Sequence, residues 1–212
     1  MKILILAPLH DIATIISSNA VLKLKDWIRK RNKELVGRKR EPIDFTVLRG
    51  FVANRMNLWF YRNTDAIFYY GHGLKDRLGD IGIRVIPIID KKNCHWFKDS
   101  IIYTMSCYSG KELSKFCIEK GVKAYFGQTT QYFGFAPSIS NKHLNDWYDL
   151  VNKIPISLML GDSCGEALRK YEAFANELKT KYLNQPPTIN SKLLFSNALN
   201  MELYGDISAE LP

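Results

Sequence analysis

The sequence predicts an α/β fold, a three-layer sandwich whose helices cover both faces of a mostly parallel sheet. First, apolar runs of strand length alternate along the chain with longer amphipathic segments, a pattern typical of this architecture. Second, 212 residues with 46% hydrophobic and 24% charged residues suffice for one domain with its own core. Third, no internal repeat, low-complexity tract or linker interrupts the chain, so we expect a single domain over residues 1–212.

Five apolar runs predict the strands of the central sheet. The first begins almost at the first residue, the second is flanked by Pro42 and Gly50, and Gly127 ends the fifth. The expected strands cover residues 2–7, 44–48, 66–70, 101–105 and 123–126.

Amphipathic segments between and after these strands predict the helices. In residues 18–35, side chains such as Leu24 and Ile28 recur at helical spacing and supply an apolar side. Further helices are expected over about 52–61, from Lys111 onward, and over about 141–152 and 163–182. Glycine and proline interrupt residues 79–89, which predicts a short hairpin or loose strand pair. Residues 193–195 and 202–204 are candidates for a return to the sheet.

The chain lacks the patterns of a membrane segment and of a paired metal site. No apolar run approaches the roughly 20 residues of a membrane span. The short apolar start is followed by Asp11 where a signal peptide would have small residues, so we expect a cytoplasmic protein without a membrane partner. The four cysteines show no CxxC spacing. We therefore expect reduced thiols, no metal and no obligatory cofactor.

The chain is basic, with a net charge of +9, and much of this charge lies between Lys23 and Arg40. One interpretation is a surface for nucleic acid or another anionic partner. The other is a solvated helix face followed by a basic loop. We favour the second because aromatic residues do not punctuate the run as they do in proteins that bind single strands. We therefore do not expect a nucleic-acid partner.

Reactive side chains follow two of the expected strands. The run at residues 67–70 leads directly into Gly71-His72-Gly73, and the run at 101–105 leads into Ser106-Cys107. Because ligands bind beyond the carboxyl ends of parallel strands, we expect His72 and Cys107 to meet at one edge of the sheet. Taken alone, Gly-His-Gly is usually a turn and a lone cysteine is usually a small core residue. Their matching positions favour a catalytic pair.

The chemistry of such a pair is that of a thiol nucleophile. A thiolate attacks, and a nearby imidazole can generate it and later protonate the leaving amine. Cys107 lies just before an expected helix, whose N-terminal dipole would favour the thiolate. The Gly73 amide, together with that of Cys107, would stabilise an oxyanion.

These motifs resemble those of the caspase-like cysteine peptidases of clan CD, a group that includes caspases, legumain, clostripain, gingipains, separase and CHAT domains. The matching segments are IFYYGHG and IIYTMSCYSG. DAIFYYGHG, GVKAYFGQT, GDSCGEALRKY and LYGD are most similar to the gingipain and CHAT branch. The resemblance implies a caspase-like fold and proteolysis, with His72 as acid and base, Cys107 as nucleophile and Gly73 in the oxyanion hole.

The candidate substrate-binding residues are Asp11 and Ser106. An acidic side chain in an S1 pocket would select arginine or lysine, and Asp11 follows the first strand where such a residue would lie. The alternative is that Asp11 caps the next helix. Met105 stands two residues before the nucleophile, where some relatives with basic specificity have aspartate, so the sequence departs from the metacaspase pattern.

The sequence therefore predicts a cysteine endopeptidase that acts on a protein or peptide substrate and has a regulatory protein partner. The alternative is a catalytically inactive caspase-like module that binds protein or peptide partners.

The remaining three cysteines are weaker candidates for a catalytic residue. Cys94 adjoins His95 on a loop or partly buried segment, Cys117 faces the core from the helix after the nucleophile, and Cys164 begins a helix capped by the preceding polar residues.

Overall fold

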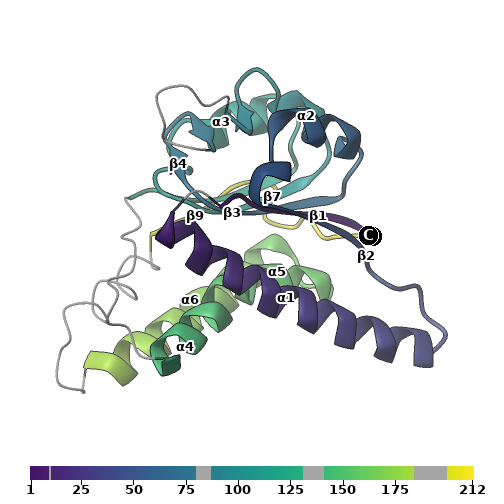
Figure 1. Cartoon of the computed structure of the whole chain (residues 1–212), viewed down its shortest axis with the longest axis vertical. Helices are drawn as coiled ribbons and strands as arrows, with labels where there is room; N and C mark the ends of the chain where they lie inside the picture. Colours follow the sequence, from purple (N-terminus) through teal and green to yellow (C-terminus); the bar gives the residue numbers. More distant parts are fainter. Residues whose placement is uncertain (10, 80–86, 131–140, 184–199) are drawn as a thin grey trace.

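The structure, a computed structural model, describes residues 1–9, 11–79, 87–130, 141–183 and 200–212. A six-stranded sheet forms its centre, and helices cover both faces, which confirms the predicted α/β architecture (Figure 1). The strands of this sheet are β1 (Lys2–Ala7), β2 (Asp44–Arg49), β3 (Ala66–Tyr70), β7 (Ile101–Met105), β8 (Ala124–Gln128) and β9 (Met201–Gly205).

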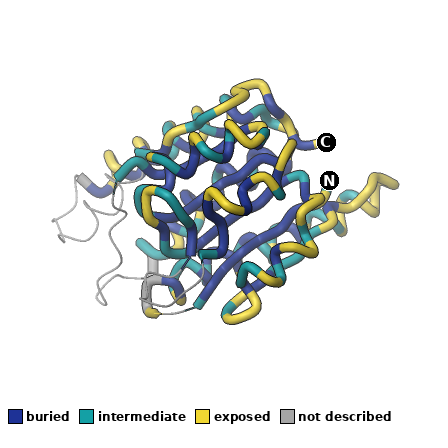
Figure 2. The backbone as a smooth tube through the Cα atoms, turned by 90° about the horizontal axis from the view of Figure 1, so that it is seen from above, coloured by how far each residue is buried: buried dark blue, intermediate teal, exposed yellow. Residues whose placement is uncertain are grey.

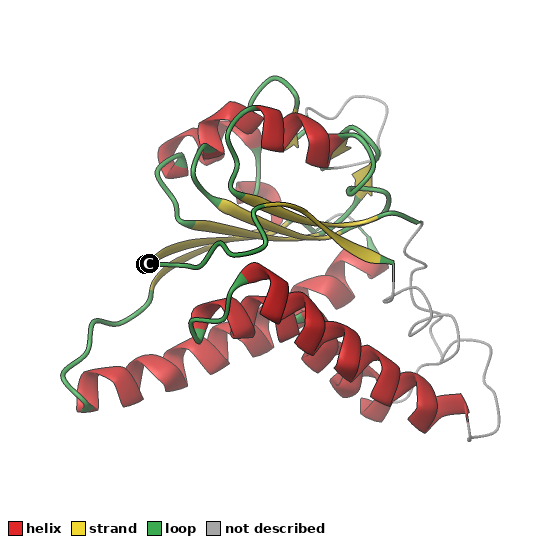
Figure 3. Ribbon diagram, turned by 180° about the vertical axis from the view of Figure 1, so that it is seen from behind, coloured by secondary structure: helices red, strands yellow, loops and turns green. Residues whose placement is uncertain are grey.

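The helices form two layers, one on each side of the sheet, as both side views show (Figures 1 and 3). One layer contains α2 (Arg55–Leu58) and α3 (Leu113–Glu119). The other contains α1 (Ile12–Gly37), α4 (Asn141–Val151), α5 (Lys153–Met159) and α6 (Cys164–Leu183). Three 3-10 turns, η1 (Gly50–Val52), η2 (Trp59–Tyr61) and η3 (Cys94–Phe97), lie in the connections between strands.

The strand order in the sheet is β2-β1-β3-β7-β8-β9. The first five strands are parallel, and β9 is antiparallel to β8. A small antiparallel sheet of β4 (Gly73–Leu74), β5 (Arg77–Leu78) and β6 (Ile89–Asp90) follows the end of β3. This order makes β1, β3 and β7 neighbours, so the connections that leave their carboxyl ends share one edge of the sheet.

Alternate residues of the central strands enter two separate cores, because successive side chains of a strand point to opposite faces. In β3, Phe68 and Tyr70 face the four-helix layer, whereas Ile67 and Tyr69 face the layer of α2 and α3. All five residues of β3 are buried. Burial on both faces explains the continuous apolar run in the sequence, and Figure 2 shows a buried backbone at the centre of the molecule.

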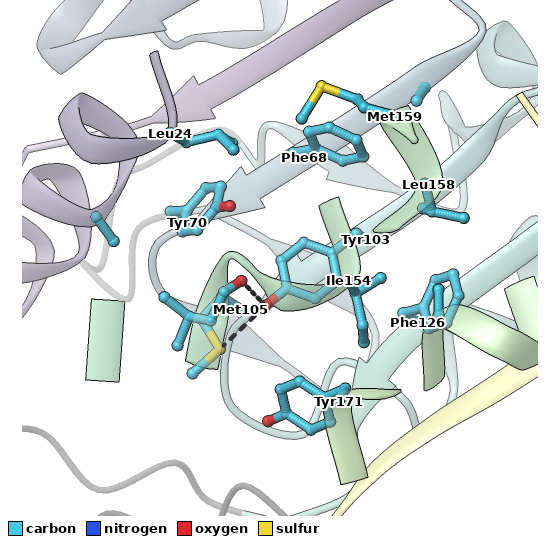
Figure 4. Packing of buried hydrophobic residues seen from close by; sticks show 14 of the residues in the cluster. Leu24, Phe68, Tyr70, Tyr103, Met105, Phe126, Ile154, Leu158, Met159 and Tyr171 are labelled. Carbon is cyan, nitrogen blue, oxygen red and sulfur yellow. Dashed lines mark hydrogen bonds between the residues drawn. The ribbon is translucent and has the colours of Figure 1, made fainter. Parts of the chain in front are cut away.

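Tyr70 of β3 and Tyr103 of β7 pack among the buried apolar side chains of the four-helix layer (Figure 4), and polar contacts tie both strands to that layer. The Tyr103 hydroxyl donates to the carbonyl oxygen of Val151 at 2.6 Å. The Tyr70 hydroxyl donates to Asn152 Oδ1 at 2.7 Å, and the Asn152 amide donates to the Ala20 carbonyl at 2.9 Å. Burial raises the pKa of Tyr70 well above its ordinary value, so this phenol stays a neutral donor.

The helix α1 begins at Ile12, so the expected start at residue 18 was wrong. Its first turn contains β-branched residues, which have modest helix propensity. Asp11 compensates by capping the helix: its carboxylate accepts from the Thr14 amide at 2.9 Å, and the Thr14 hydroxyl lies 2.9 Å from the Asp11 amide nitrogen. The predicted alternative for Asp11, a helix cap, is confirmed.

The connection between β2 and β3 is a series of short turns and not the single helix expected over 52–61. Gly50 has φ 69°, a left-handed conformation that glycine adopts readily, and it turns the chain out of β2. Asn54 has extended backbone angles and caps α2. The helical turns η1 and α2 are therefore separate, and a new helix begins after Asn54.

Other boundaries also differ from expectation. The helix expected from Lys111 begins at Leu113, since the amides of Glu112 and Leu113 both donate to the Lys75 carbonyl, at 2.9 and 2.8 Å. Most of the hairpin expected within residues 79–89 falls on residues 80–86, which lie outside the described residues, as does the expected strand at 193–195. The flanks of the first segment, β5 and β6, pair antiparallel. The expected return to the sheet at 202–204 is confirmed by β9.

The basic run from Lys23 to Arg40 lies on α1 and in the turn that follows it, and all of its basic side chains are at least partly exposed. Several pair with acidic neighbours, for example Lys23 with Asp149 at 2.7 Å. Within the described ranges, no helix is both long and apolar enough to cross a membrane.

Candidate active site

The strands β3 and β7 end in register at the carboxyl edge of the sheet. Tyr70 pairs with Met105, and the Gly71 amide donates to the Met105 carbonyl at 3.4 Å. His72 follows Tyr70 by two residues, and Cys107 follows Met105 by two residues. The structure therefore places the two residues at equivalent positions just beyond the ends of neighbouring strands, at the edge of the sheet that the sequence predicted for both.

Gly73 lies against the backbone that carries Cys107. A Cβ atom at position 73 would be 2.6 Å from Ser106 Oγ and 3.0 Å from the Cys107 carbonyl oxygen. Distances this short leave no room for a side chain, so only glycine fits without movement of its neighbours. The loops that follow β3 and β7 are therefore in direct contact.

His72 also contacts the loop that follows β1, the neighbour of β3 on its other side. The His72 Nε2 atom lies 2.6 Å from Asp11 Oδ2, while Asp11 Oδ1 accepts from the Thr14 amide. One carboxylate therefore caps α1 and holds the imidazole at the same time. Neither contact tests the S1 role predicted for Asp11, which stays a prediction.

The environment of Asp11 favours its ionised form. Burial alone would raise the pKa of this carboxyl, but the hydrogen bond from the Thr14 amide and the contact with His72 outweigh burial and lower the pKa below its ordinary value of 3.8. Near neutral pH, Asp11 is therefore a carboxylate that accepts a hydrogen bond from the imidazole.

The backbone of His72 is fixed by two donors. The buried Tyr69 hydroxyl donates to the His72 carbonyl at 2.8 Å, and the Gly79 amide donates to the same oxygen at 3.1 Å. The His72 side chain retains 18% exposure, so part of the imidazole ring is open to solvent. Sequence reasoning missed these anchors, and the aromatic residues of the strand were the available signal.

The loop that carries Cys107 is fastened to the neighbouring strand β8. Tyr108 has φ 52°, an uncommon conformation for a bulky residue, directly after Cys107. Its amide donates to the Thr130 carbonyl at 3.0 Å, and the Gly110 amide donates to the Gln128 carbonyl at 2.9 Å. A sharp turn held from the side thus presents Cys107 at the sheet edge.

The predicted role of a helix dipole at Cys107 needs correction. The helix α3 begins at Leu113, six residues after Cys107, and spans only seven residues. The field of a helix terminus falls off within about one turn. The dipole of α3 therefore does not support the predicted thiolate at Cys107.

Ser106, the second predicted substrate-binding residue, is buried with 2% exposure. Its hydroxyl oxygen has no hydrogen-bond partner within the described part of the chain. The hydroxyl faces the position that a side chain on Gly73 would occupy. The structure thus places Ser106 beneath the contact between the two loops, and its role toward a substrate stays a prediction.

Cys107 differs from the other three cysteines, since it is partly exposed and they are buried. A hydrogen bond with Cys117 lowers the pKa of Cys94, and the same bond together with burial raises the pKa of Cys117 well above its ordinary value. Burial raises the pKa of the Cys164 thiol to about 12. Within the described ranges, no group of three or more His, Cys, Asp or Glu residues is arranged to hold a metal ion.

Comparison with known proteins gives structural relatives only. No protein-family model matches the chain, and no curated protein matches it in sequence. One similar solved structure is the Arg-specific cysteine proteinase gingipain R, with a TM-score of 0.55 and 12% identity over 99% of this chain and 47% of that one. Another, described as a protease, has a TM-score of 0.62 and 13% identity over 99% of this chain and 48% of that one.

The chain therefore has a caspase-like fold, as the resemblance of its motifs implied. It spans about half the length of each of the two structures. At identities of 12% and 13%, the likeness concerns the fold, and the arginine specificity belongs to gingipain R.

Proposed function

We propose that the chain is a cysteine endopeptidase in which Cys107 is the nucleophile and His72 the general acid and base. The observation that carries the proposal is the in-register ending of β3 and β7, which gives His72 and Cys107 equivalent positions at one sheet edge. The carboxylate of Asp11, 2.6 Å from the imidazole, supplies the third group of a nucleophile–base–orienter arrangement.

The contact with Asp11 favours one tautomer of His72. A carboxylate only accepts, so Nε2 carries the proton that it donates to Asp11. In the neutral ring, Nδ1 then has the lone pair and can act as the base. Asp11 orients the ring and stabilises the imidazolium that forms, and it keeps its own negative charge throughout.

In the first half of the reaction, His72 Nδ1 takes the proton of the Cys107 thiol, and the thiolate attacks the carbonyl carbon of the scissile peptide bond. A carbon–sulfur bond forms, and the carbonyl electrons move to oxygen. The amides of Gly73 and Cys107 donate to this oxyanion. The imidazolium returns its proton to the peptide nitrogen, the carbon–nitrogen bond breaks, and the amine product leaves behind a thioester.

In the second half, water replaces the amine. His72 Nδ1 takes a proton from the water molecule as its oxygen attacks the thioester carbonyl, and the same amides stabilise the second oxyanion. The carbon–sulfur bond then breaks, the sulfur regains a proton from the imidazolium, and the acid product leaves. Apart from the substrate and this water molecule, the balance of protons and electrons involves only Cys107 and His72.

The test is peptide hydrolysis by the purified chain, measured with a mixture of fluorogenic peptides that together present all P1 residues. We expect hydrolysis by the wild type and its loss in both Cys107→Ala and His72→Ala, with the far-UV circular dichroism unchanged. Cys164→Ala and His95→Ala are the matched controls, because Cys164 lies in the core and His95 is an exposed residue of η3. Equal hydrolysis in the wild type and the two site variants would overturn the proposal.

A second outcome would favour the alternative of an inactive module. In that case, the wild type and both site variants would bind peptides with the same affinity, and none of them would hydrolyse the peptides. A protein or peptide substrate, a regulatory protein partner and a cytoplasmic location stay predictions.

A further inference from the structure

Five exposed apolar side chains are concentrated in the connection between β2 and β3. Phe51 is 87% exposed, Met56 81% and Phe60 78%. Val52 and Trp59 are close to half exposed. We call these five residues the β2–β3 surface. Large apolar residues at this exposure, gathered within ten consecutive residues, are typical of interaction sites.

The backbone beneath the β2–β3 surface is firmly held. The Asn54 side chain accepts from the Asn57 amide at 3.0 Å and donates to the Phe51 carbonyl at 2.8 Å. The Asn57 side chain donates to the Val52 carbonyl at 2.9 Å. Ala53 and Leu58 are buried in the core beneath α2. The exposed side chains are therefore carried by a backbone that hydrogen bonds and buried neighbours hold in place.

At one side of this surface, Trp59 contacts a second tryptophan and an arginine. Its ring makes an edge-to-face contact with Trp96, with centroids 5.0 Å apart. The guanidinium of Arg62 lies 4.3 Å from the Trp59 ring centroid. These contacts occupy the indole, so it does not offer an open face for stacking by a nucleic-acid base.

The composition of the connection matches the centre of protein–protein interfaces. Between Arg49 and Asp65, this connection contains Arg55 and Arg62 and no Asp, Glu, Lys or Ser. Interface centres are enriched in aromatic residues, Met and Arg and depleted in Lys, Glu, Asp and Ser. Segments that bind anionic membranes or nucleic acids are instead rich in lysine as well as arginine. A protein partner therefore fits this surface best.

The charges of the surface indicate the chemistry of that partner. Arg49 and Arg62 are exposed at its two ends, while Arg55 pairs with Asp90 at 3.0 Å. Two copies of the chain joined through this surface would bring arginines together, which disfavours self-association. A segment with carboxylates beside its apolar side chains would complement the arginines.

We propose that the β2–β3 surface binds a protein segment that presents apolar side chains flanked by Asp or Glu. The surface begins at the carboxyl end of β2, where Arg49 pairs with Ala7 of β1, and the loop after β1 carries Asp11 (Figure 1). A bound segment would therefore lie beside the candidate active site. The proposal does not depend on peptidase activity.

The test measures binding of labelled helical peptides to the Cys107→Ala chain by fluorescence anisotropy, so that hydrolysis cannot alter the probe. One peptide carries leucines on one side and glutamates on the other. A second has lysines in place of the glutamates, and a third has serines in place of the leucines. We expect the first to bind, and the second and third to bind at least about tenfold more weakly, because both apolar and charge contacts contribute.

The matched variants replace three exposed apolar side chains with serine. Phe51→Ser, Met56→Ser and Phe60→Ser together should weaken binding of the first peptide by about tenfold or more, as expected for central interface residues. Val36→Ser, Leu160→Ser and Ile207→Ser together are the control, since each of these residues is more than half exposed elsewhere. The control should bind as the parent does.

Several results would overturn the proposal. These are no binding of the leucine–glutamate peptide, equal weakening in the two sets of variants, or equal binding of all three peptides. The chain could instead bind phosphatidylserine vesicles or a single-stranded oligonucleotide and not the leucine–glutamate peptide. If the Phe51, Met56 and Phe60 variant loses that binding, the surface belongs to a membrane or a nucleic-acid site. A dimer in sedimentation that is lost in that variant would assign it to self-association.

Discussion

His72 Nε2 lies 2.6 Å from Asp11 Oδ2, although 61 residues separate them in the chain. The contact exists because β1 is hydrogen-bonded to β3, so the cap of α1 lies beside the turn after β3. The start of a long helix and the position of an imidazole are thereby determined by the same carboxylate. Stability and activity are expected to respond differently when this carboxylate is changed.

Asp11→Asn should separate these two roles. The asparagine side-chain oxygen can still cap α1, so the free energy of unfolding should change little, whereas Asp11→Ala should lose about 0.5–2 kcal/mol. The asparagine amide would donate to the ring and favour the wrong His72 tautomer, so kcat for peptide hydrolysis should fall by at least about tenfold. Urea unfolding and steady-state kinetics measure both effects. An Asn variant with wild-type kcat would contradict the orienting role.

The acid stability of the chain should also depend on Asp11. The folded-state pKa of this carboxyl is lowered from 3.8, so its contribution is complete above the unfolded value and is lost as pH falls through the folded value. The difference in unfolding free energy between the wild type and Asp11→Ala should therefore be constant near neutral pH and shrink below about pH 4. A difference that grows on acidification would have the wrong sign.

Gly73→Ala should disturb the site through a specific collision. The new methyl group would meet Ser106 Oγ at 2.6 Å and Ser106 Cβ at 2.9 Å. We expect loss of peptide hydrolysis, and partial recovery in the double variant Gly73→Ala with Ser106→Gly, which removes both colliding atoms. Recovery remains partial because the Cys107 carbonyl oxygen stays 3.0 Å away. Additive losses in the double variant would show that the two positions do not interact.

Gly127→Ala tests the fastening of the Cys107 loop to β8. A Cβ atom at position 127 would lie 2.7 Å from the Gly110 backbone, which cannot move aside as a flexible side chain would. We expect a loss of about 1–3 kcal/mol in urea unfolding, typical of overpacking. Gly37→Ala is the control, since no atom lies within 4 Å of its added Cβ. It should leave stability unchanged or raise it by up to about 1 kcal/mol.

Much of the fold was predictable because buried parallel strands leave a direct signal. The run that ends at Tyr70 and the run that ends at Met105 are apolar or aromatic except for Thr104, and the structure pairs Tyr70 with Met105. The rule that parallel strands share a carboxyl edge then brought His72 and Cys107 to the same edge. The apolar runs and the parallel strand order agree here, so the position of both residues at this edge was predictable from the sequence.

Other features depended on contacts between distant segments. The start of α1 was missed because its first turn has weak intrinsic helix propensity, and a cap at Asp11 outweighs propensity. The contact of Asp11 with His72 required the strand order β1-β3, which periodicity does not reveal. The start of α3 was placed too early because its first amides bond to Lys75, a residue of another loop. That error produced the helix-dipole argument for Cys107.

The central claim is that His72 activates the Cys107 thiol, and native-state alkylation tests it most directly. The other three cysteines are buried, so iodoacetamide should modify Cys107 first in the folded wild type, as followed by mass spectrometry of each cysteine peptide. We predict that His72→Ala slows this modification near neutral pH by at least about tenfold, because the base that generates the thiolate is gone. Equal rates of Cys107 alkylation in the wild type and in His72→Ala would contradict the account.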